Sequence, residues 1–586
     1  YKFPSSNNLI EVPPVHSLLN PELYPKDLYV QEILQFNPRY YYQYLMYLTA
    51  KLGVGLPLTY LIYYVAAFSS FILGLYALGK KFGRSTLSSV ALVFLGLATT
   101  DGTIGNVSLF RTEPIPAIFA MGLAIWGIYF CFSKKWFIGY LLFGLACLLQ
   151  FLVGVLPGGL LASLVILDAK KNHNLRTAIV PFLTLGALAS LVYLPMMMAG
   201  NTDSGTLSHK GFVYLYGYIR HPHHIIPSAW PIQTWRNFIL FMLGGLLCIK
   251  SSSSLDSEEK LNLFTVIAGS LVALLIGYVF VELYPLSLVA KLQLARTTPF
   301  AKLMVLIAIS ALVNEHYRRK NIAIMSLLLV APILHNGAIL LFLVAVGLVT
   351  LKETNLFQVM RSKLATGIVL VGSLLVIGLY PLPSSISDLF NQVVWKLALF
   401  LILAFPFLLE EFGNSARMIK PVTYSLAFTS CLFFMLGVMG TLPKNLLDFF
   451  QNRVTIYHVP NDDVTKLALR FRDSSSKDVL VLSPPSATKF RFYSQRSVVF
   501  NFYNVPFTDR GLQEWAKRMQ SILGSVKPPL SWSNVDLLFR KRSGSELVTV
   551  AKQFDANYIL TRSDWHSGIK GRVVDREGKW IIYKID

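Results

Sequence analysis

Charged residues are scarce in this chain: Asp, Glu, Lys and Arg make up 14% of its 586 residues, while 54% are hydrophobic. Soluble domains carry about 25% charged residues. Water alone therefore cannot solvate most of this sequence, and we expect a protein embedded in membrane lipids.

Cysteines and nucleotide-binding motifs are also rare. The four cysteines, Cys131, Cys147, Cys248 and Cys431, all lie in apolar runs, and the sequence contains no CxxC pair. This pattern excludes a disulfide framework and a cysteine metal site, and it is typical of small core residues. The sequence contains no GxGxxG motif and no Walker loop, so nothing indicates nucleotide binding.

Acidic residues are few, 31 against 53 Lys and Arg, which gives a net charge of +22. Such a charge can indicate nucleic-acid binding, but here the basic residues form short clusters between apolar runs. The clusters are GKKFGR (79–84), SKK (133–135), AKKNHNLR (169–176), HYRRK (316–320), residues 352–363 and SARMIK (415–420). Short basic joints are typical of cytoplasmic loops, so we expect membrane lipids and no nucleic acid as partners.

The apolar runs predict a mainly α fold, a polytopic transmembrane helical bundle of about 13–14 spans or re-entrant segments, since roughly 20 apolar residues cross a bilayer. They lie near 56–78, 86–99, 113–132, 137–151, 152–168, 177–199, 236–250, 262–282, 299–314, 321–334, 337–351, 364–380, 392–409 and 421–442. Polar, Pro or Gly residues interrupt the pairs 137–168 and 321–351. Each pair is either two tilted spans or a re-entrant hairpin.

If the spans alternate, the basic joints share one side of the membrane, and segments 1–41, 99–106, 200–235 and 283–298 share the other. We therefore expect an outer first loop with acidic residues (1–41), a transmembrane bundle (42–442) and an extracytoplasmic α/β domain (443–586). In the last part, strand-like runs near 478–483, 497–503 and 556–562 alternate with helical patterns at 509–524 and 545–554. An outer loop needs a segment that exports it, so we also expect a helix ahead of Tyr1.

The first loop carries the candidate catalytic residues Glu11, Glu22 and Asp27. A carboxylate can take a proton from an acceptor hydroxyl or hold a divalent cation. The alternative is a proline-rich loop whose acids only face water.

Candidate substrate-binding residues lie in the remaining outer segments. They are Arg111, Glu113, Arg220, His221, His223, His224 and Arg296. Arginine grips phosphate with two hydrogen bonds, so these residues could form a cationic phosphate pocket. Alternatively, the histidines bind a metal, although HPHH (221–224) lacks the helical spacing of metal ligands. Arg111 and Glu113 could instead neutralise each other, and Arg296 could instead contact lipid headgroups.

Three segments resemble uncharacterised bacterial membrane proteins related to the GT-C glycosyltransferases: NNLIEVPPVHSLLNPELYPKDLYVQ (7–31), HPHHIIPSAWP (221–231) and QLARTTPF (293–300). The expected architecture is also similar to that superfamily, which includes protein O-mannosyltransferases, oligosaccharyltransferases and the aminoarabinose transferase. The resemblance implies transfer of a hexosyl or pentosyl group from a polyprenyl-phosphate donor to a glycan, lipid or protein acceptor, at the outer face of the bacterial plasma membrane. Asp27, Glu22 or Glu11 would be the base. Arg296 with His221, His223 or His224 would meet the phosphate.

One departure leaves two more hypotheses open. Many GT-C enzymes carry an acid early in the first loop, where this chain has Asn7-Asn8, and an amide cannot take a proton. Either another carboxylate replaces that base, or the protein is an inactive scaffold or assembly protein with possible partner membrane subunits. The second hypothesis is a transporter, but transporters place ionisable groups inside the membrane, and here the polar groups gather at one interface.

Overall fold

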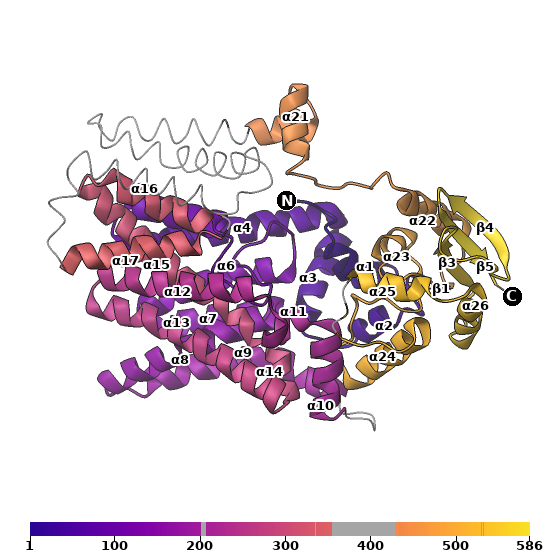
Figure 1. The fold of residues 1–586 in the computed structure, drawn as a ribbon, viewed down its shortest axis with the longest axis horizontal. Coiled ribbons are helices and arrows are strands. Elements are labelled where there is room, and N and C mark those ends of the chain that lie inside the picture. The colour runs from indigo at the N-terminus through magenta and orange to yellow at the C-terminus, as the bar shows by residue number, and fades with distance from the viewer. Residues whose placement is uncertain are drawn as a thin grey trace.

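The computed structural model describes residues 1–200, 207–334, 336–353, 429, 432–528, 530 and 532–585. The expected spans at 364–380 and 392–409, the first part of that at 421–442, the joint at 415–420 and most of the joint at 352–363 lie outside the described residues. In Figure 1 a helical bundle lies beside a smaller domain that contains the sheet, and the N-terminal helices lie where the two meet.

Six helical stretches are long and apolar enough to cross a membrane, which confirms a mainly helical, membrane-embedded protein. They are Leu56–Gly83 (α4), Phe151–Lys171 (α8), Arg176–Met198 within Arg176–Gly200 (α9), Ile232–Ser251 (α12), Ser257–Leu283 (α13, Ser257–Tyr278, with η4, Val279–Leu283) and Ser287–Arg318 (α14, Ser287–Leu292; η5, Leu294–Thr297; α15, Thr298–Arg318). The shorter apolar helices are Thr86–Ala98 (α5), Pro116–Phe132 (α6), Trp136–Leu149 (α7), Ile322–Val330 (α16) with Ala331–Ile333 (η6), and Ala338–Glu353 (α17). Helix α15 is buried throughout its apolar window and packs against α4, α5, α12, α13 and α16.

Each interrupted apolar pair forms two separate helices. The first pair divides at Gln150, whose extended backbone (φ −151°, ψ 103°) ends α7 and precedes α8. The 14 residues of α7 rise about 21 Å at 1.5 Å per residue, which is less than the roughly 30 Å of membrane hydrocarbon. A continuous span over residues 137–151 is therefore too short to cross by itself.

The basic joints at 79–84, 133–135, 169–176 and 316–320 meet at one end of the bundle. Arg84 lies 3.0 Å from Glu259, and Lys134 lies 3.5 Å from Asp168 and also pairs with Glu258. At the same end Ser253 donates to Glu315 of α15 from its backbone N–H. These contacts support the alternation of spans that the charge pattern predicts.

The N-terminal segment is largely helical rather than a loop. It contains Asn8–Leu19 (α1), Leu28–Leu34 (α2) and Tyr40–Thr49 (α3), followed by the π-helix Ala50–Val54 (η1). Asp27 caps α2, because its side chain accepts a hydrogen bond from the Val30 N–H over 3.0 Å. We call residues 1–41 the head.

The C-terminal region contains helices on a small mixed sheet. The helices are Lys444–Gln451 (α21), Asp463–Ser474 (α22), Thr488–Ser494 (α23), Asp509–Leu523 (α24), Trp532–Arg540 (α25) and Gly544–Gln553 (α26), and the strands are Leu480–Leu482 (β1), Ser497–Val498 (β2), Tyr558–Arg562 (β3), Arg572–Glu577 (β4) and Trp580–Lys584 (β5). The strand order is β2-β1-β3-β5-β4. Val481 of β1 pairs in parallel with Val498 and Tyr558, and β5 pairs antiparallel with β3 and β4. The carboxyl ends of β1, β2 and β3 therefore share one edge, where open α/β sheets bind ligands.

The fold predicts which introduced cysteines an impermeant maleimide reaches in sealed, oriented vesicles. Cysteines replacing the exposed Glu22 in the head and the exposed Lys210 should react from the same side. A cysteine replacing Lys171, at the end with the basic joints, should react only after the vesicles are opened. Labelling of Glu22→Cys and Lys210→Cys from opposite sides would contradict this arrangement, and the unsubstituted chain is the control.

Candidate functional site

The polar segments that the sequence assigns to one side lie together. Asn8 of α1 donates from Nδ2 to the carbonyl oxygen of Pro114 over 2.9 Å. His224 in the next polar segment places Nδ1 2.7 Å from the carbonyl oxygen of Gly105. The connection 99–115 therefore lies between the head and the histidine segment.

The histidine segment folds into short helical pieces rather than a loop. It consists of His209–Phe212 (α10), the π-helix Val213–Arg220 (η2), Pro222–Ile225 (α11) and Pro227–Ala229 (η3). Proline at the first position of α11 fixes the turn after His221. The result is a compact group of imidazoles, with ring centroids 4.2 Å apart for His223 and His224 and 6.3 Å apart for His221 and each of the others.

Arginines from four parts of the chain lie near these rings or near one another. His223 lies within electrostatic range of Arg220, Arg296 and Arg111, and Arg296 lies within that range of Arg39. We refer to these groups as the arginine–histidine cluster: Arg39, Arg111, Arg220, Arg296, His221, His223 and His224. The side chains of the cluster are partly exposed, so an entering ligand can reach them.

The histidines of the cluster are neutral near pH 7. Burial lowers the pKa of His223 to about 4, and the neighbouring Arg220 and Arg296 add to this effect. Burial first, and then Arg220 for His221 and Arg296 for His224, lower the pKa of these two rings well below the ordinary value. Like charges and desolvation both disfavour the imidazolium form.

Two of the imidazoles have a fixed tautomer. His221 Nδ1 lies 3.1 Å from the carbonyl oxygen of Tyr216, and His224 Nδ1 lies 2.7 Å from that of Gly105. A carbonyl oxygen only accepts hydrogen bonds, so Nδ1 carries the proton in both rings. Each Nε2 is therefore an acceptor while the ring is neutral and becomes a donor once the ring gains a second proton.

Arg220 has no carboxylate partner among the described residues. Its Nη2 donates to the carbonyl oxygen of Tyr503 over 3.0 Å, and its guanidinium lies 5.5 Å and 5.7 Å from the ring centroids of Phe502 and Tyr503. Its buried Nε has no hydrogen-bond partner in the part of the chain that the structure describes, and burial lowers the pKa of Arg220 to about 10. The loop that follows β2 thus holds this cation without neutralising it.

Arg296 and Arg111 likewise bond neutral oxygens. Arg296 donates from Nε to Gln293 over 2.6 Å, and Gln293 in turn donates to the Tyr216 hydroxyl over 3.1 Å. Arg111 donates from Nη2 to the carbonyl oxygen of Asn106 over 2.8 Å. Among the described residues, neither guanidinium forms an ion pair. A group of cations without counter-ions favours an anionic ligand.

Glu11 is the carboxylate joined to this cluster. Its Oε1 lies 2.5 Å from Nη1 of Arg39, and its buried Oε2 has no hydrogen-bond partner among the described residues. Burial raises the pKa of Glu11, and Arg39 only partly opposes the rise. Arg39 also lies 5.6 Å from the ring centroid of Phe507, so the loop after β2 contacts this pair as well.

The other two candidate carboxylates are bound by the C-terminal domain. Asp27 is buried and paired with Arg491 of α23, through Nε at 2.7 Å and Nη2 at 2.9 Å. Glu22 is 70% exposed and lies 2.5 Å from Lys477, which lowers the pKa of Glu22. Neither residue contacts the arginine–histidine cluster in the described structure.

Glu113 is not neutralised by Arg111. Its oxygens accept hydrogen bonds from Ser6 and from the amide of Asn7. Asn7, which stands where the resemblance implies an acid, therefore holds a carboxylate instead of being one. Glu113 lies beside the head and is not bonded to the cluster.

No metal centre is formed within the described residues, where no three His, Cys, Asp or Glu groups converge as ligands. His221 and His224 use Nδ1 for backbone carbonyl oxygens, and the cations around them would repel a metal ion. The arrangement suits an anion better.

The sequence analysis did not identify Arg39 or the loop after β2. Arg39 had a recognisable signal, because it is a lone cation in the aromatic run FNPRYYYQY (36–44). Arg491 and Tyr503 lie hundreds of residues from the partners that they bind, and no local pattern marks such contacts.

Residues 462–522 match a family described as a domain of unknown function (DUF6798). This match covers α22 to α24 of the C-terminal region. No curated protein matches the chain.

The buried pair of Asp27 and Arg491 predicts a stability difference between two variants. Asp27→Asn should destabilise the protein by about 3–5 kcal/mol, because it leaves the buried Arg491 without its counter-ion. Thermal unfolding of the purified full-length protein measures this loss as a lower Tm. Glu22→Gln, which breaks an exposed ion pair on the same domain, is the control and should leave Tm unchanged. An unchanged Tm for Asp27→Asn would show that the pair is not structural.

Proposed function

We propose that the protein is a membrane glycosyltransferase of the GT-C type, which moves a sugar from a polyprenyl-phosphate donor to an acceptor hydroxyl. The observation that carries this proposal is the group of three guanidiniums, from Arg111, Arg220 and Arg296, that have no carboxylate partner in the described structure. Arg39, which lies within electrostatic range of Arg296, pairs with the carboxylate of Glu11.

The phosphate of the donor would bind at the arginine–histidine cluster. Guanidinium groups bind phosphate oxygens with paired hydrogen bonds. As the bond between the anomeric carbon and the phosphate oxygen breaks, its electron pair stays on the phosphate. Fixed cations at that position would stabilise the developing charge.

Glu11 is the base that the geometry favours. Its raised pKa and its unpartnered oxygen suit a group that accepts a proton as the acceptor oxygen attacks the anomeric carbon. Arg39 would act as a positioning residue, since it holds Oε1 and leaves Oε2 for the acceptor. Attack opposite the phosphate would invert the configuration at the anomeric carbon.

The basic joints support an orientation for this reaction. The joints that the structure describes gather at the end of the bundle away from the cluster, since α15 runs from Thr298, close to Arg296, to Arg318 in the joint 316–320. Positively charged joints face the cytoplasm in most membrane proteins. The site and the C-terminal domain would then face outward from a bacterial plasma membrane. The donor chain would reach the site from the lipid.

Replacement of Glu11 tests the proposal most simply. Transfer of labelled sugar from polyprenyl-phosphate hexoses and pentoses should be about 10²–10⁴-fold slower in Glu11→Gln, while the donor still binds. Glu22→Gln, which also removes a charge from the head, should keep full activity. Donor binding without transfer in the wild-type protein would favour the inactive scaffold instead. Full activity of Glu11→Gln would exclude Glu11 as the base.

The raised pKa of Glu11 also sets the direction of the pH dependence. A base must be ionised, so kcat should fall as pH falls through the pKa of Glu11, which lies above the ordinary carboxyl value of 4.5. The acidic limb of the pH profile should disappear in Glu11→Gln, together with most of the rate. A limb centred below pH 4.5 would contradict the assignment.

The fixed tautomers predict that phosphodiester binding takes up protons. Neutral His221 and His224 present an Nε2 lone pair, and a bound anion favours the imidazolium form that can donate from Nε2. Affinity for a polyprenyl phosphodiester should therefore rise as pH falls from 8 to 6, by up to about tenfold per unit for each proton taken up. A phosphodiester does not titrate in this range, so the effect belongs to the protein. His224→Gln should reduce the slope, and an affinity independent of pH in the wild-type protein would contradict this role.

A further inference from the structure

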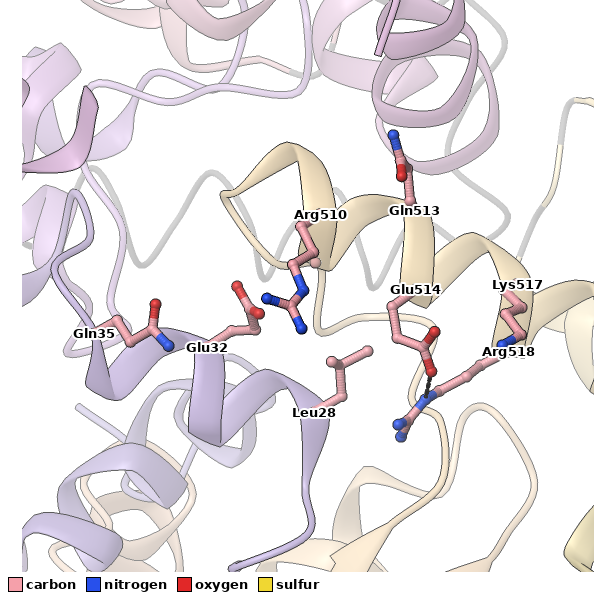
Figure 2. A pocket seen from close by; sticks show the side chains of 9 residues that line it. Leu28, Glu32, Gln35, Arg510, Gln513, Glu514, Lys517 and Arg518 are labelled. Carbon is pink, nitrogen blue, oxygen red and sulfur yellow. Dashed lines mark hydrogen bonds and ion pairs between the residues drawn. The ribbon is translucent and has the colours of Figure 1, made fainter. Parts of the chain in front are cut away.

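A polar pocket lies between the head and the C-terminal domain, and none of the residues that line it belongs to the arginine–histidine cluster. It has a volume of about 500 Å³ and is lined by Leu28, Glu32, Gln35, Arg510, Gly511, Gln513, Glu514, Lys517 and Arg518. Helix α2 and the residue after it form one wall, and α24 forms the other (Figure 2). This volume lies within the range of small-molecule sites, about 300–1,000 Å³.

The lining mixes hydrogen-bond donors and acceptors without a strong charge of either sign. Its three cations face two carboxylates, and two amide side chains add both donors and acceptors. Glu514 pairs with Arg518 over 2.8 Å, and Glu32 accepts a hydrogen bond from Thr508 over 2.6 Å. In Figure 2 Glu32 and Arg510 point toward one another.

This chemistry fits a neutral ligand with many hydroxyl groups. A hydroxyl donates to a carboxylate and accepts from a guanidinium or ammonium group, so vicinal hydroxyls can use both kinds of group at once. An anion would meet Glu32 and Glu514 as well as the cations. An apolar ligand would leave the charged groups desolvated and unpaired.

The pocket adjoins the proposed base through a shared loop. Thr508, whose hydroxyl bonds Glu32 at the pocket, follows Phe507, whose ring lies under Arg39. Arg39 holds Glu11, and Gln35 at the other wall is in the same connection between α2 and α3 as Arg39. A ligand held here would therefore lie beside the Glu11–Arg39 pair, on the side of the head that faces the C-terminal domain.

We infer that this pocket binds a neutral saccharide, and that this saccharide is the glycan part of the acceptor. The assignment as acceptor rests on the proposed function, whereas the binding of a saccharide does not. The C-terminal domain would then contribute to acceptor binding, because α24 supplies one wall of the pocket.

Saturation-transfer NMR on the full-length protein in lipid nanodiscs, free of sugar-headed detergent, tests this inference. The probes are maltose, cellobiose and di-N-acetylchitobiose. Inorganic pyrophosphate is the anionic probe, and because it has no C–H protons its binding is followed by broadening of its phosphorus-31 signal. At least one disaccharide should receive saturation from the wild-type protein. The signal should be lost in Gln35→Trp, in which an indole fills the pocket from an exposed position.

A matched substitution distinguishes a blocked pocket from general damage to the fold. Gln520→Trp places the same side chain at an exposed position on α24 that does not line the pocket, and it should keep the saccharide signal. Glu11→Gln should keep the signal as well, so the pocket is tested even if the protein transfers no sugar. The inference is overturned if no disaccharide binds, if pyrophosphate binds in the pocket in place of saccharides, or if Gln35→Trp binds as well as the wild type.

Discussion

The ion pair between Asp27 and Arg491 joins the head to the C-terminal domain in a position that water does not reach. Both side chains are buried, and the guanidinium also lies 5.6 Å and 5.8 Å from the ring centroids of Tyr24 and Tyr29. In such surroundings each charge depends on the other, since either one alone would be buried and unpaired. The pair fixes α2 against α23. It thereby fixes the position of the α2–α3 connection, which carries Arg39, relative to the loop after β2.

The cations of the proposed phosphate site are held by neutral groups from different parts of the chain. Their arrangement therefore depends on how the head, the bundle and the C-terminal domain are held together. Arg220 rests on the loop after β2, and Arg296 is held by Gln293 within the bundle. Cations that bind carbonyl and amide oxygens keep their charge available for a ligand. Burial raises the pKa of Glu11, and burial together with the neighbouring Arg220 lowers the pKa of His223. The proposed reaction would use both effects, with a carboxylate suited to accept a proton and imidazoles that would gain a proton when an anion binds.

The sequence predicts those features of the structure that leave a local pattern in the chain. Apolar runs and basic joints predict the bundle and the meeting of the joints, and the helical pattern at 545–554 predicts α26. The cluster residues Arg220, His221, His223 and Arg296 were predictable as a group, because alternating spans put their segments on one side. The structure of the head could not be predicted in this way. Pro13 and Pro14 lie inside α1, and the partner of Asp27 is 464 residues away, so neither the helix nor the structural role of Asp27 can be read locally. Choosing Glu11 over Asp27 needed the long-range contacts.

The central claim is that one phosphate occupies the arginine–histidine cluster while Glu11 stays free to accept a proton. An experimental density map of the protein with a bound polyprenyl-phosphate sugar tests it most directly. The account predicts phosphate oxygens within hydrogen-bonding distance of Arg220 and Arg296 and of at least one histidine Nε2, with the sugar on the side of Glu11. A phosphate bound at the basic joints, at the other end of the bundle, would contradict it.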